Sequence, residues 1–156
     1  MKILIAGASG AIGQPLVDMV VQEGHEVYGI TQSKERALII AGKGARPLIL
    51  NVLDREAIFS SIASLKPEVV IDMLTHLPKE YTPESMRAAA ELDAKIRREG
   101  GANLQAAAEA SGTSRYIVQS SGFCNWSQAR LAAATVFKAN KRYSGRLGLI
   151  KALIML

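Results

Sequence analysis

The chain has 156 residues, of which 49% are hydrophobic and 21% are charged, and it contains one cysteine, Cys124. These totals predict one globular domain, exclude an internal disulfide and a cysteine-based metal site, and are typical of a protein in the reducing cytoplasm. The formal charge of +5 is uneven, because residues 1–123 hold 13 basic and 14 acidic residues, whereas residues 124–156 hold six basic residues and no acidic one.

Residues 2–121 alternate between predicted strands and predicted helices. Residues 2–6, KILIA, form a continuous apolar run that ends at a glycine, which is typical of a buried strand. Helices are predicted at 11–23, 33–42, 54–65 and 83–111, with further strands between and after them at 25–30, 45–50, 67–74 and 115–121. Ser33 and Asp54 are the predicted N-caps of the second and third helices. Gly100 and Gly101 mark either a break in the last helix or a close approach to a neighbour.

This alternation predicts an α/β fold. Parallel strands joined by right-handed helical crossovers form a doubly wound, Rossmann-like sheet with helices on both faces and the strand order 3-2-1-4-5.

Neither a membrane nor a nucleic acid is an expected partner. No apolar stretch approaches the roughly 18 residues that would cross a bilayer, and the run Ile3–Ala6 is too short for the core of a signal peptide. The basic residues of 124–156 come without paired aromatics or a recognised nucleic-acid-binding pattern, so we interpret them as a solvated face. A cytoplasmic location and no metal site are therefore expected.

Three glycines at intervals of three, in AGASGAIG, follow the first predicted strand. Gly7 permits a tight turn, Gly10 lets the backbone approach a diphosphate, and Gly13 lets the helix pack closely on the sheet. The N–H groups of Ala11, Ile12 and Gly13 then face the phosphates at the positive end of a helix, and Ser9 adds a hydroxyl donor. The residues predicted to hold the diphosphate are Gly7, Ser9, Gly10, Ala11, Ile12 and Gly13. The alternative is an ordinary turn.

GASGAIG resembles the GxxGxxG motif of short-chain dehydrogenases/reductases, and the wider pattern resembles their extended branch, the NAD-dependent epimerase/dehydratase family. The further residues that carry this resemblance are LNVLDREAI, PEVVIDMLTH, GGANLQAAAEASG and RYIVQSSGF, and together they cover about residues 1–123. The resemblance implies that Leu53 and Asp54 flank the adenine of the cofactor, and that Leu74, Thr75 and His76 lie near its nicotinamide-side ribose. Asp54 alternatively serves only as a helix cap, and His76 only as a loop histidine.

The choice between NAD and NADP depends on the end of the second strand, where NAD enzymes place an acid. Thr31, Gln32 and Ser33 stand there instead, and Ser33, Lys34 and Arg36 are suited to a 2′-phosphate. NADP is therefore favoured over NAD, although Glu35 weakens the positive field. The alternative is a solvated helix start.

The family's chemistry, which the resemblance implies, uses a serine after the fifth strand and a Tyr-x-x-x-Lys motif on the next helix. Ser121 stands at the serine position, with Ser120 beside the cofactor, unless both hydroxyls only cap the strand end. No tyrosine of the chain is followed by a lysine four residues later. Arg97 also departs from the family, which often has an asparagine there. The chain is therefore expected to be catalytically incomplete as given.

The resemblance is expected to end where the charge balance changes. We interpret residues 1–123 as an NAD(P)-binding domain and residues 124–156 as an atypical basic tail, and we leave open whether the tail packs on the same domain. The hypothesis is a truncated or frameshifted chain that lacks the family's C-terminal substrate domain. The expected function is that of an NAD(P)-binding protein resembling sugar-nucleotide epimerases/dehydratases. A non-catalytic NAD(P)-binding sensor and a degenerate gene product are the alternatives. The small-molecule substrate cannot be inferred from the residues, and a homodimer is left open.

Overall fold

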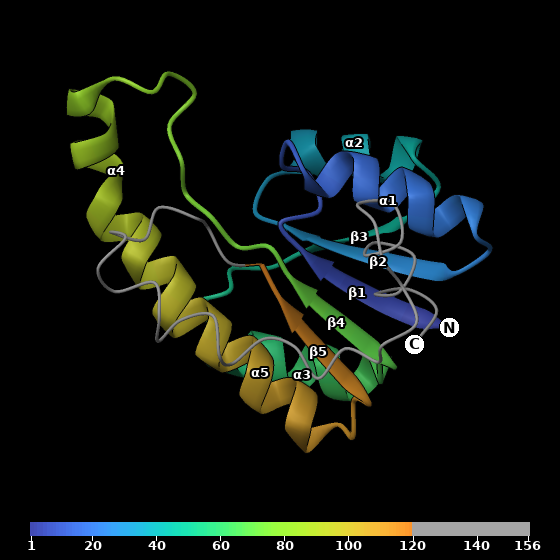
Figure 1. Ribbon diagram of the computed structural model, residues 1–156. Helices are drawn as coiled ribbons and strands as arrows, with labels where there is room; N and C mark the ends of the chain where they lie inside the picture. The colour runs from blue at the N-terminus through green and yellow to red at the C-terminus, as the bar shows by residue number, and fades with distance from the viewer. Residues whose placement is uncertain (120–156) are drawn as a thin grey trace, which may run out of the picture. The chain divides into compact units, whose positions relative to one another are not determined.

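The computed structural model describes residues 1–119, which form one parallel sheet with helices on both faces (Figure 1). Its strand order is β3-β2-β1-β4-β5, which confirms the predicted topology. The strands are β1 (Lys2–Ala6), β2 (Glu26–Thr31), β3 (Arg46–Ile49), β4 (Val69–Asp72) and β5 (Arg115–Val118). The chain adds β2 and β3 on one side of β1 and then returns to add β4 and β5 on the other side. The point where the strand order reverses therefore lies between β1 and β4, next to the crossover that joins β1 to β2.

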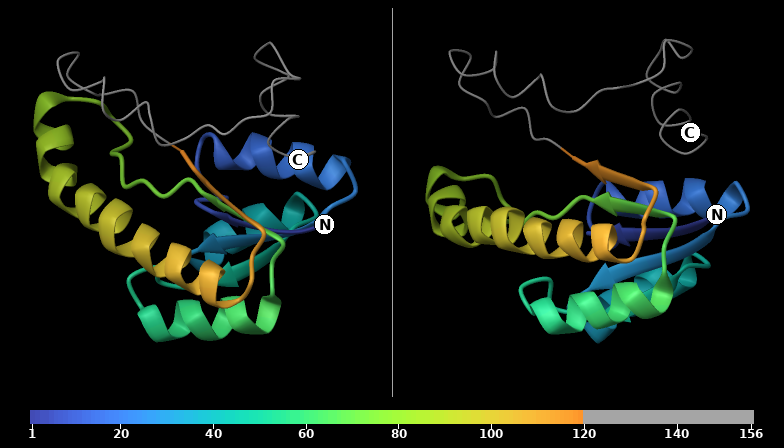
Figure 2. Two further views of the ribbon diagram at one scale, coloured as in Figure 1. Left: turned by 60° about the horizontal axis from the view of Figure 1, so that its bottom comes forward. Right: turned by 90° about the horizontal axis from the view of Figure 1, so that it is seen from below.

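Two sets of helices cover the two faces. The helices are α1 (Gly13–Gln22), α2 (Lys34–Gly42), α3 (Arg55–Leu65), α4 (Pro83–Lys95), the π-helical turn η1 (Ile96–Gly100) and α5 (Gly101–Ala110). Figures 1 and 2 show α1 and α2 on one face of the sheet and α3 and α5 on the other. No helix within residues 1–119 is long and apolar enough to cross a membrane.

The buried strand β1 separates two apolar layers. Leu4 and Ala6 pack in one cluster with Ile58 and Ile62 of α3 and Leu104 of α5. Because side chains alternate along a strand, the equally buried Ile3 and Ile5 point to the face that α1 and α2 cover. The continuous apolar run of β1 is thus explained by burial on both sides.

Helix α1 begins later than predicted. The expected start was Ala11, whereas the regular hydrogen-bonded helix starts at Gly13. Gln14 already donates to the carbonyl of Gly10 at 3.0 Å, but Pro15 has no N–H with which to continue the ladder. The fourth and fifth strands also end earlier than expected, at Asp72 and Val118.

The predicted long helix is continuous but contains a π-helical turn. Helix α4 opens with a capping box between Thr82 and Ser85, and α5 follows η1 without a break. The two glycines mark a close approach. A Cβ on Gly100 would lie 2.8 Å from Val52 Cγ2, and one on Gly101 would lie 3.1 Å from the carboxylate of Asp72. None of the residues of α4 is buried, whereas α5 packs on the sheet.

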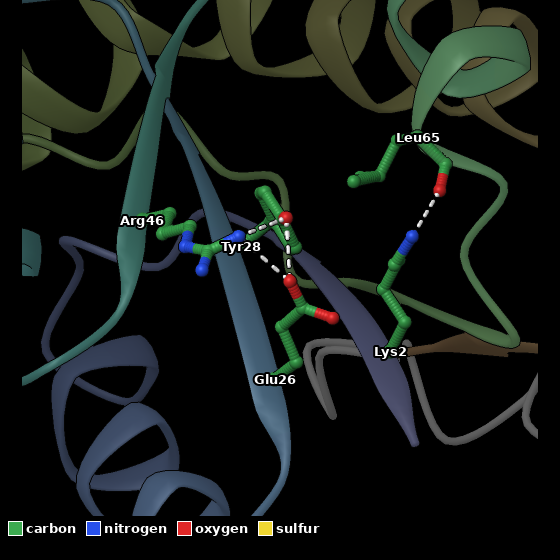
Figure 3. A network of polar contacts seen from close by, with 5 residues as sticks. All are labelled: Lys2, Glu26, Tyr28, Arg46 and Leu65. Carbon is green, nitrogen blue, oxygen red and sulfur yellow. Dashed lines mark hydrogen bonds and ion pairs between the residues drawn. The ribbon is translucent and has the colours of Figure 1, made fainter.

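A polar network joins the amino ends of β2 and β3 (Figure 3). Arg46 Nη1 lies 2.7 Å from Glu26 Oε1 and 2.8 Å from the hydroxyl of Tyr28. At the amino end of β1, Lys2 Nζ donates to the carbonyl of Leu65 at 2.9 Å. Because the Arg46 and Glu26 side chains are largely solvent-accessible, we expect their ion pair to contribute little to stability. The opposite edge of the sheet, at the carboxyl ends, carries the residues predicted to bind a ligand.

Candidate functional site

The carboxyl ends of the five parallel strands lie at one edge of the sheet, and the predicted site residues follow them. Four groups of predicted residues lie at this edge: Gly7 to Gly13 after β1, Thr31 at the end of β2 with Gln32, Ser33 and Arg36 after it, Leu53 and Asp54 after β3, and Leu74 to His76 after β4. Ser120 and Ser121, predicted to follow the fifth strand, lie outside the described residues. So does the predicted domain boundary after residue 123.

The loop after β1 leaves no room for a side chain at Gly7 and Gly13 and little room at Gly10. Gly7 has a φ of +79°, and a Cβ there would lie 2.6 Å from the carbonyl oxygen of Met73. A Cβ on Gly13 would lie 2.8 Å from the carbonyl carbon of Ala8 and closer still to the Gly7 oxygen. Gly10 is exposed, donates to the Gly7 carbonyl at 3.0 Å, and would bring a Cβ within 3.2 Å of that oxygen. Close packing therefore fixes the loop between β1, α1 and the segment after β4.

This loop presents unused donors. Among the described residues, none accepts a hydrogen bond from the N–H groups of Ala11, Ile12 or Gly13. Ala11 and Ile12 are exposed, and the Ser9 carbonyl accepts a hydrogen bond from Gln14 Nε2 at 3.0 Å. Free N–H groups at the start of a helix favour an anion.

Gly29 of β2 is a further residue on which this loop depends, and the sequence analysis missed it. A Cβ on Gly29 would lie 2.7 Å from Ala8 Cβ and 3.0 Å from Ile40 Cγ2. Ala8 belongs to the loop and Ile40 to α2, so the missing side chain lets both pack on the sheet. A glycine inside the strand EVYGIT is the signal that could have indicated this approach.

The end of β2 holds a buried hydroxyl without a partner. Thr31 is 5% exposed, and its Oγ1 has no hydrogen-bond partner among the described residues. Ser33 caps α2 by accepting from the N–H of Arg36 at 3.2 Å, as predicted. Gln32 and Arg36 are exposed. Hydrogen bonds from the backbone and Ser33 lower the pKa of Glu35, which keeps a negative charge close to Arg36.

The segment after β3 is organised by Asp54. Its Oδ1 accepts from the N–H of Ala57 at 3.1 Å, so the predicted capping of α3 is confirmed. Leu53 is half-buried, and its N–H donates to Asn51 Oδ1 at 3.1 Å. Asn103 of α5 donates to the carbonyl of Val52 at 3.0 Å. The contact of Leu53 and Asp54 with an adenine remains a prediction.

The segment after β4 is held by two carboxylates. Leu74 is half-buried, and its N–H donates to Asp72 Oδ1 at 3.0 Å. The N–H of the exposed His76 donates to Asp93 Oδ1, and the other oxygen of Asp93 pairs with Arg97 Nε at 2.7 Å. Thr75 is exposed between them. The imidazole of His76 forms no hydrogen bond within residues 1–119.

These residues fit a ligand that carries a diphosphate. The loop after β1 offers unused N–H donors in a cradle that side chains would fill, and Thr31 offers an orphaned hydroxyl at the neighbouring strand end. The described residues hold no group of three or more His, Cys, Asp or Glu side chains that would bind a metal ion.

Comparisons with known proteins point to the same class of site. Residues 3–143 match the sequence model of the NAD dependent epimerase/dehydratase family, which extends beyond residue 123, where the resemblance was expected to end. The 3-diazoavenalumate denitrifying reductase of a Streptomyces species is 38% identical over 125 residues, which are 79% of this chain and 38% of that protein.

Solved structures agree on the fold. The UDP-glucose 4-epimerase of Thermotoga maritima superposes with a TM-score of 0.66 at 21% identity, over 78% of this chain and 38% of that one. The Bordetella bronchiseptica enzyme WbmG, in complex with NAD and UDP, superposes with a TM-score of 0.59 at 25% identity, over 76% of this chain and 37% of that one. The chain thus spans less than half the length of these relatives.

Proposed function

The chain belongs to the NAD dependent epimerase/dehydratase family, and we propose that it binds a nicotinamide dinucleotide at the carboxyl edge of its sheet. This proposal rests on the structure of the loop after β1. Its three glycines lie where side chains would collide with backbone or crowd it, and its helix-start N–H groups are unused among the described residues. That combination matches what a diphosphate requires.

Each part of the cofactor has a proposed set of residues. The N–H groups of the Gly7–Gly13 loop and the hydroxyl of Ser9 hold the diphosphate. Thr31 Oγ1 meets the adenosine ribose, and Leu53 and Asp54 flank the adenine. The segment Leu74–His76 lies beside the nicotinamide-side ribose, and Ser120 is proposed to contact the cofactor as well. When bound, such a cofactor accepts or supplies a hydride.

We propose NADP as the preferred cofactor, with NAD as the alternative. No acid stands at positions 31–33 to accept hydrogen bonds from ribose hydroxyls. Arg36 is exposed and forms no ion pair within residues 1–119, so its guanidinium is free for a 2′-phosphate. Glu35 opposes this preference, because its lowered pKa keeps it ionised next to Arg36.

The proposed reaction class is hydride transfer on a hydroxyl or keto substrate, such as a nucleotide sugar. The relatives include a reductase and a UDP-glucose 4-epimerase. Ser121 is proposed to hold the reacting oxygen. The chain has no tyrosine with a lysine four residues later, so the pair that moves the proton in the family's chemistry is missing from its 156 residues. This favours, as a second candidate, a non-catalytic NAD(P)-binding sensor.

Titration of the purified chain with NADPH and NADH, followed by the fluorescence of the reduced nicotinamide, tests the proposal. We expect saturable binding of both with NADPH bound more tightly, and no turnover of keto substrates by the chain alone. A folded chain that binds neither nucleotide would contradict the proposed site. Tighter binding of NADH would contradict the cofactor preference, and measurable turnover would overturn the catalytic incompleteness.

A further inference from the structure

A buried carboxylate lies at the end of β4, behind the proposed nicotinamide segment. Asp72 is the last residue of β4 and is 5% exposed. Tyr116 of the neighbouring strand β5 lies on the same face, because Val70, its register partner, is two residues before Asp72. The Tyr116 hydroxyl is 2.9 Å from Asp72 Oδ2. The sequence analysis assigned no role to either residue.

The long helix packs against this pair, of which Asp72 is buried and Tyr116 is half-buried. Gly101, the first residue of α5, leaves only 3.1 Å between an added Cβ and Asp72 Oδ2. The carbonyl oxygen of Gly101 is also 3.1 Å from the Tyr116 hydroxyl. The hydroxyl therefore faces two acceptors, one on β4 and one on α5.

The number of protons does not match the number of acceptors when Asp72 is ionised. The hydroxyl of Tyr116 has a single proton, which cannot fully satisfy both the carboxylate and the Gly101 carbonyl. The Gly101 carbonyl also accepts the helical bond from the N–H of Gln105, so the choice of the hydroxyl decides only whether Tyr116 is bonded to α5. When Asp72 is protonated, its own O–H donates to the Tyr116 oxygen, the Tyr116 hydroxyl donates to Gly101, and all of these groups are satisfied.

Burial and the neighbouring polar groups shift the pKa of Asp72 in opposite directions. Burial raises the pKa of Asp72, while the hydrogen bonds from Leu74 N–H and Tyr116 and the charge of Arg97 on η1 act to lower it. Burial and the neighbouring Asp72 raise the pKa of Tyr116, so its hydroxyl keeps its proton. The carboxylate of Asp93 on α4 forms an ion pair with Nε of Arg97.

We propose that Asp72 is a positioning residue that shares a proton with Tyr116, and that this chain of hydrogen bonds sets the segment Leu74–His76 against the long helix. Oδ1 of Asp72 fixes the N–H of Leu74, and Oδ2 reaches α5 through the Tyr116 hydroxyl. When Asp72 is ionised, the Tyr116 hydroxyl donates to Oδ2 and its hydrogen bond to Gly101 is lost, which loosens the connection to α5. The effect on cofactor affinity rests on the proposed function, whereas the proton sharing does not.

Three variants of the full chain test this inference. Asp72→Asn keeps an oxygen for Leu74 and gives Tyr116 a permanent donor, so it imitates the protonated carboxyl. Tyr116→Phe removes the shared proton. Tyr28→Phe is the matched control, because Tyr28 also bonds a carboxylate, that of Glu26, but at the opposite end of the sheet. The measurements are the thermal unfolding midpoint and the NADPH and NADH affinities, each over a pH range that begins near the ordinary aspartate pKa of 3.8 and extends upward.

The sign of the pH effect follows from the raised pKa. An acid whose pKa is raised by folding stabilises the fold below its ordinary pKa, and this contribution is lost as the pH rises through the raised value. The unfolding midpoint of the wild type should therefore fall with pH relative to that of Asp72→Asn. Tyr116→Phe should move this transition to higher pH, because it removes a hydrogen bond that favours the carboxylate.

The cofactor affinity is expected to follow the same transition. The wild type should bind more weakly above it, Asp72→Asn should lose the pH dependence, and Tyr116→Phe should bind about tenfold more weakly than Tyr28→Phe. The inference is overturned if Asp72→Asn shows the pH dependence of the wild type, or if Tyr116→Phe matches Tyr28→Phe in both measurements. If the wild type binds neither nucleotide, the proposed function fails, and the unfolding midpoints alone decide on the shared proton.

Discussion

Gly10→Ala separates the binding role of the glycine loop from its packing role. A Cβ on Gly10 would meet only the Gly7 carbonyl oxygen, at 3.2 Å, and Gly10 is exposed. The neighbour must move by a few tenths of an ångström, so we expect the free energy of unfolding to fall by no more than about 1 kcal/mol. The same methyl group projects from the backbone that a diphosphate would approach. We expect the affinity for NADPH and NADH to fall at least tenfold, which is about 1.4 kcal/mol or more.

Two further variants calibrate this result. Gly13→Ala would place a Cβ 2.8 Å from the carbonyl carbon of Ala8, where only backbone movement gives relief, so we expect a stability loss of about 1 to 3 kcal/mol. Gly42→Ala, at the end of α2, would meet no atom within 4 Å and should leave stability within about 1 kcal/mol of the wild type, with unchanged affinity. Urea unfolding gives the stabilities, and fluorescence titration gives the affinities. A Gly10→Ala chain that binds both nucleotides like the wild type would refute the role given to this glycine.

Three other predictions test neighbouring parts of the site. Arg36→Ala should weaken NADPH binding about tenfold and leave NADH binding unchanged, because only NADPH carries the 2′-phosphate; an equal loss for both nucleotides would contradict this role. Asp54→Ala should lower the free energy of urea unfolding by about 1 kcal/mol, whereas Asp54→Asn keeps the cap of α3; equal losses would show that the cap is unimportant. Gly100→Ala would place its Cβ 2.8 Å from Val52 Cγ2, so it should lower the free energy of unfolding by about 1 to 3 kcal/mol. In a double-mutant cycle, the second substitution Val52→Ala should recover part of that loss.

The strand order could be predicted because it follows from the alternation of apolar runs with helices and from the handedness of crossovers. The element ends were harder to predict, since they depend on single hydrogen bonds. Pro15 moves the regular start of α1 to Gly13. Asp72 was expected inside the fourth strand, but the strand ends there because its side chain takes the N–H of Leu74.

The candidate site was predictable where a local pattern carries the chemistry. The glycine spacing indicated the loop after β1, and Ser33 and Asp54 were correctly placed as helix caps. The Asp72–Tyr116 pair was missed because its partners are 44 residues apart and meet only through strand register. An acid at the end of a run as apolar as VVID was the available signal.

The π-helical turn sets the direction of α4 relative to α5. A π turn holds more residues than an α-helical turn, and each residue of an α-helix rotates the chain by about 100°. Because α5 is fixed by its packing on α3 and the sheet, the loss of one residue within 96–100 would rotate α4 relative to α5. Asp93 would then turn away from His76, and Ile96, which packs in the apolar cluster, would turn with it. A one-residue deletion or insertion here would thus change the segment after β4 and the apolar layer together.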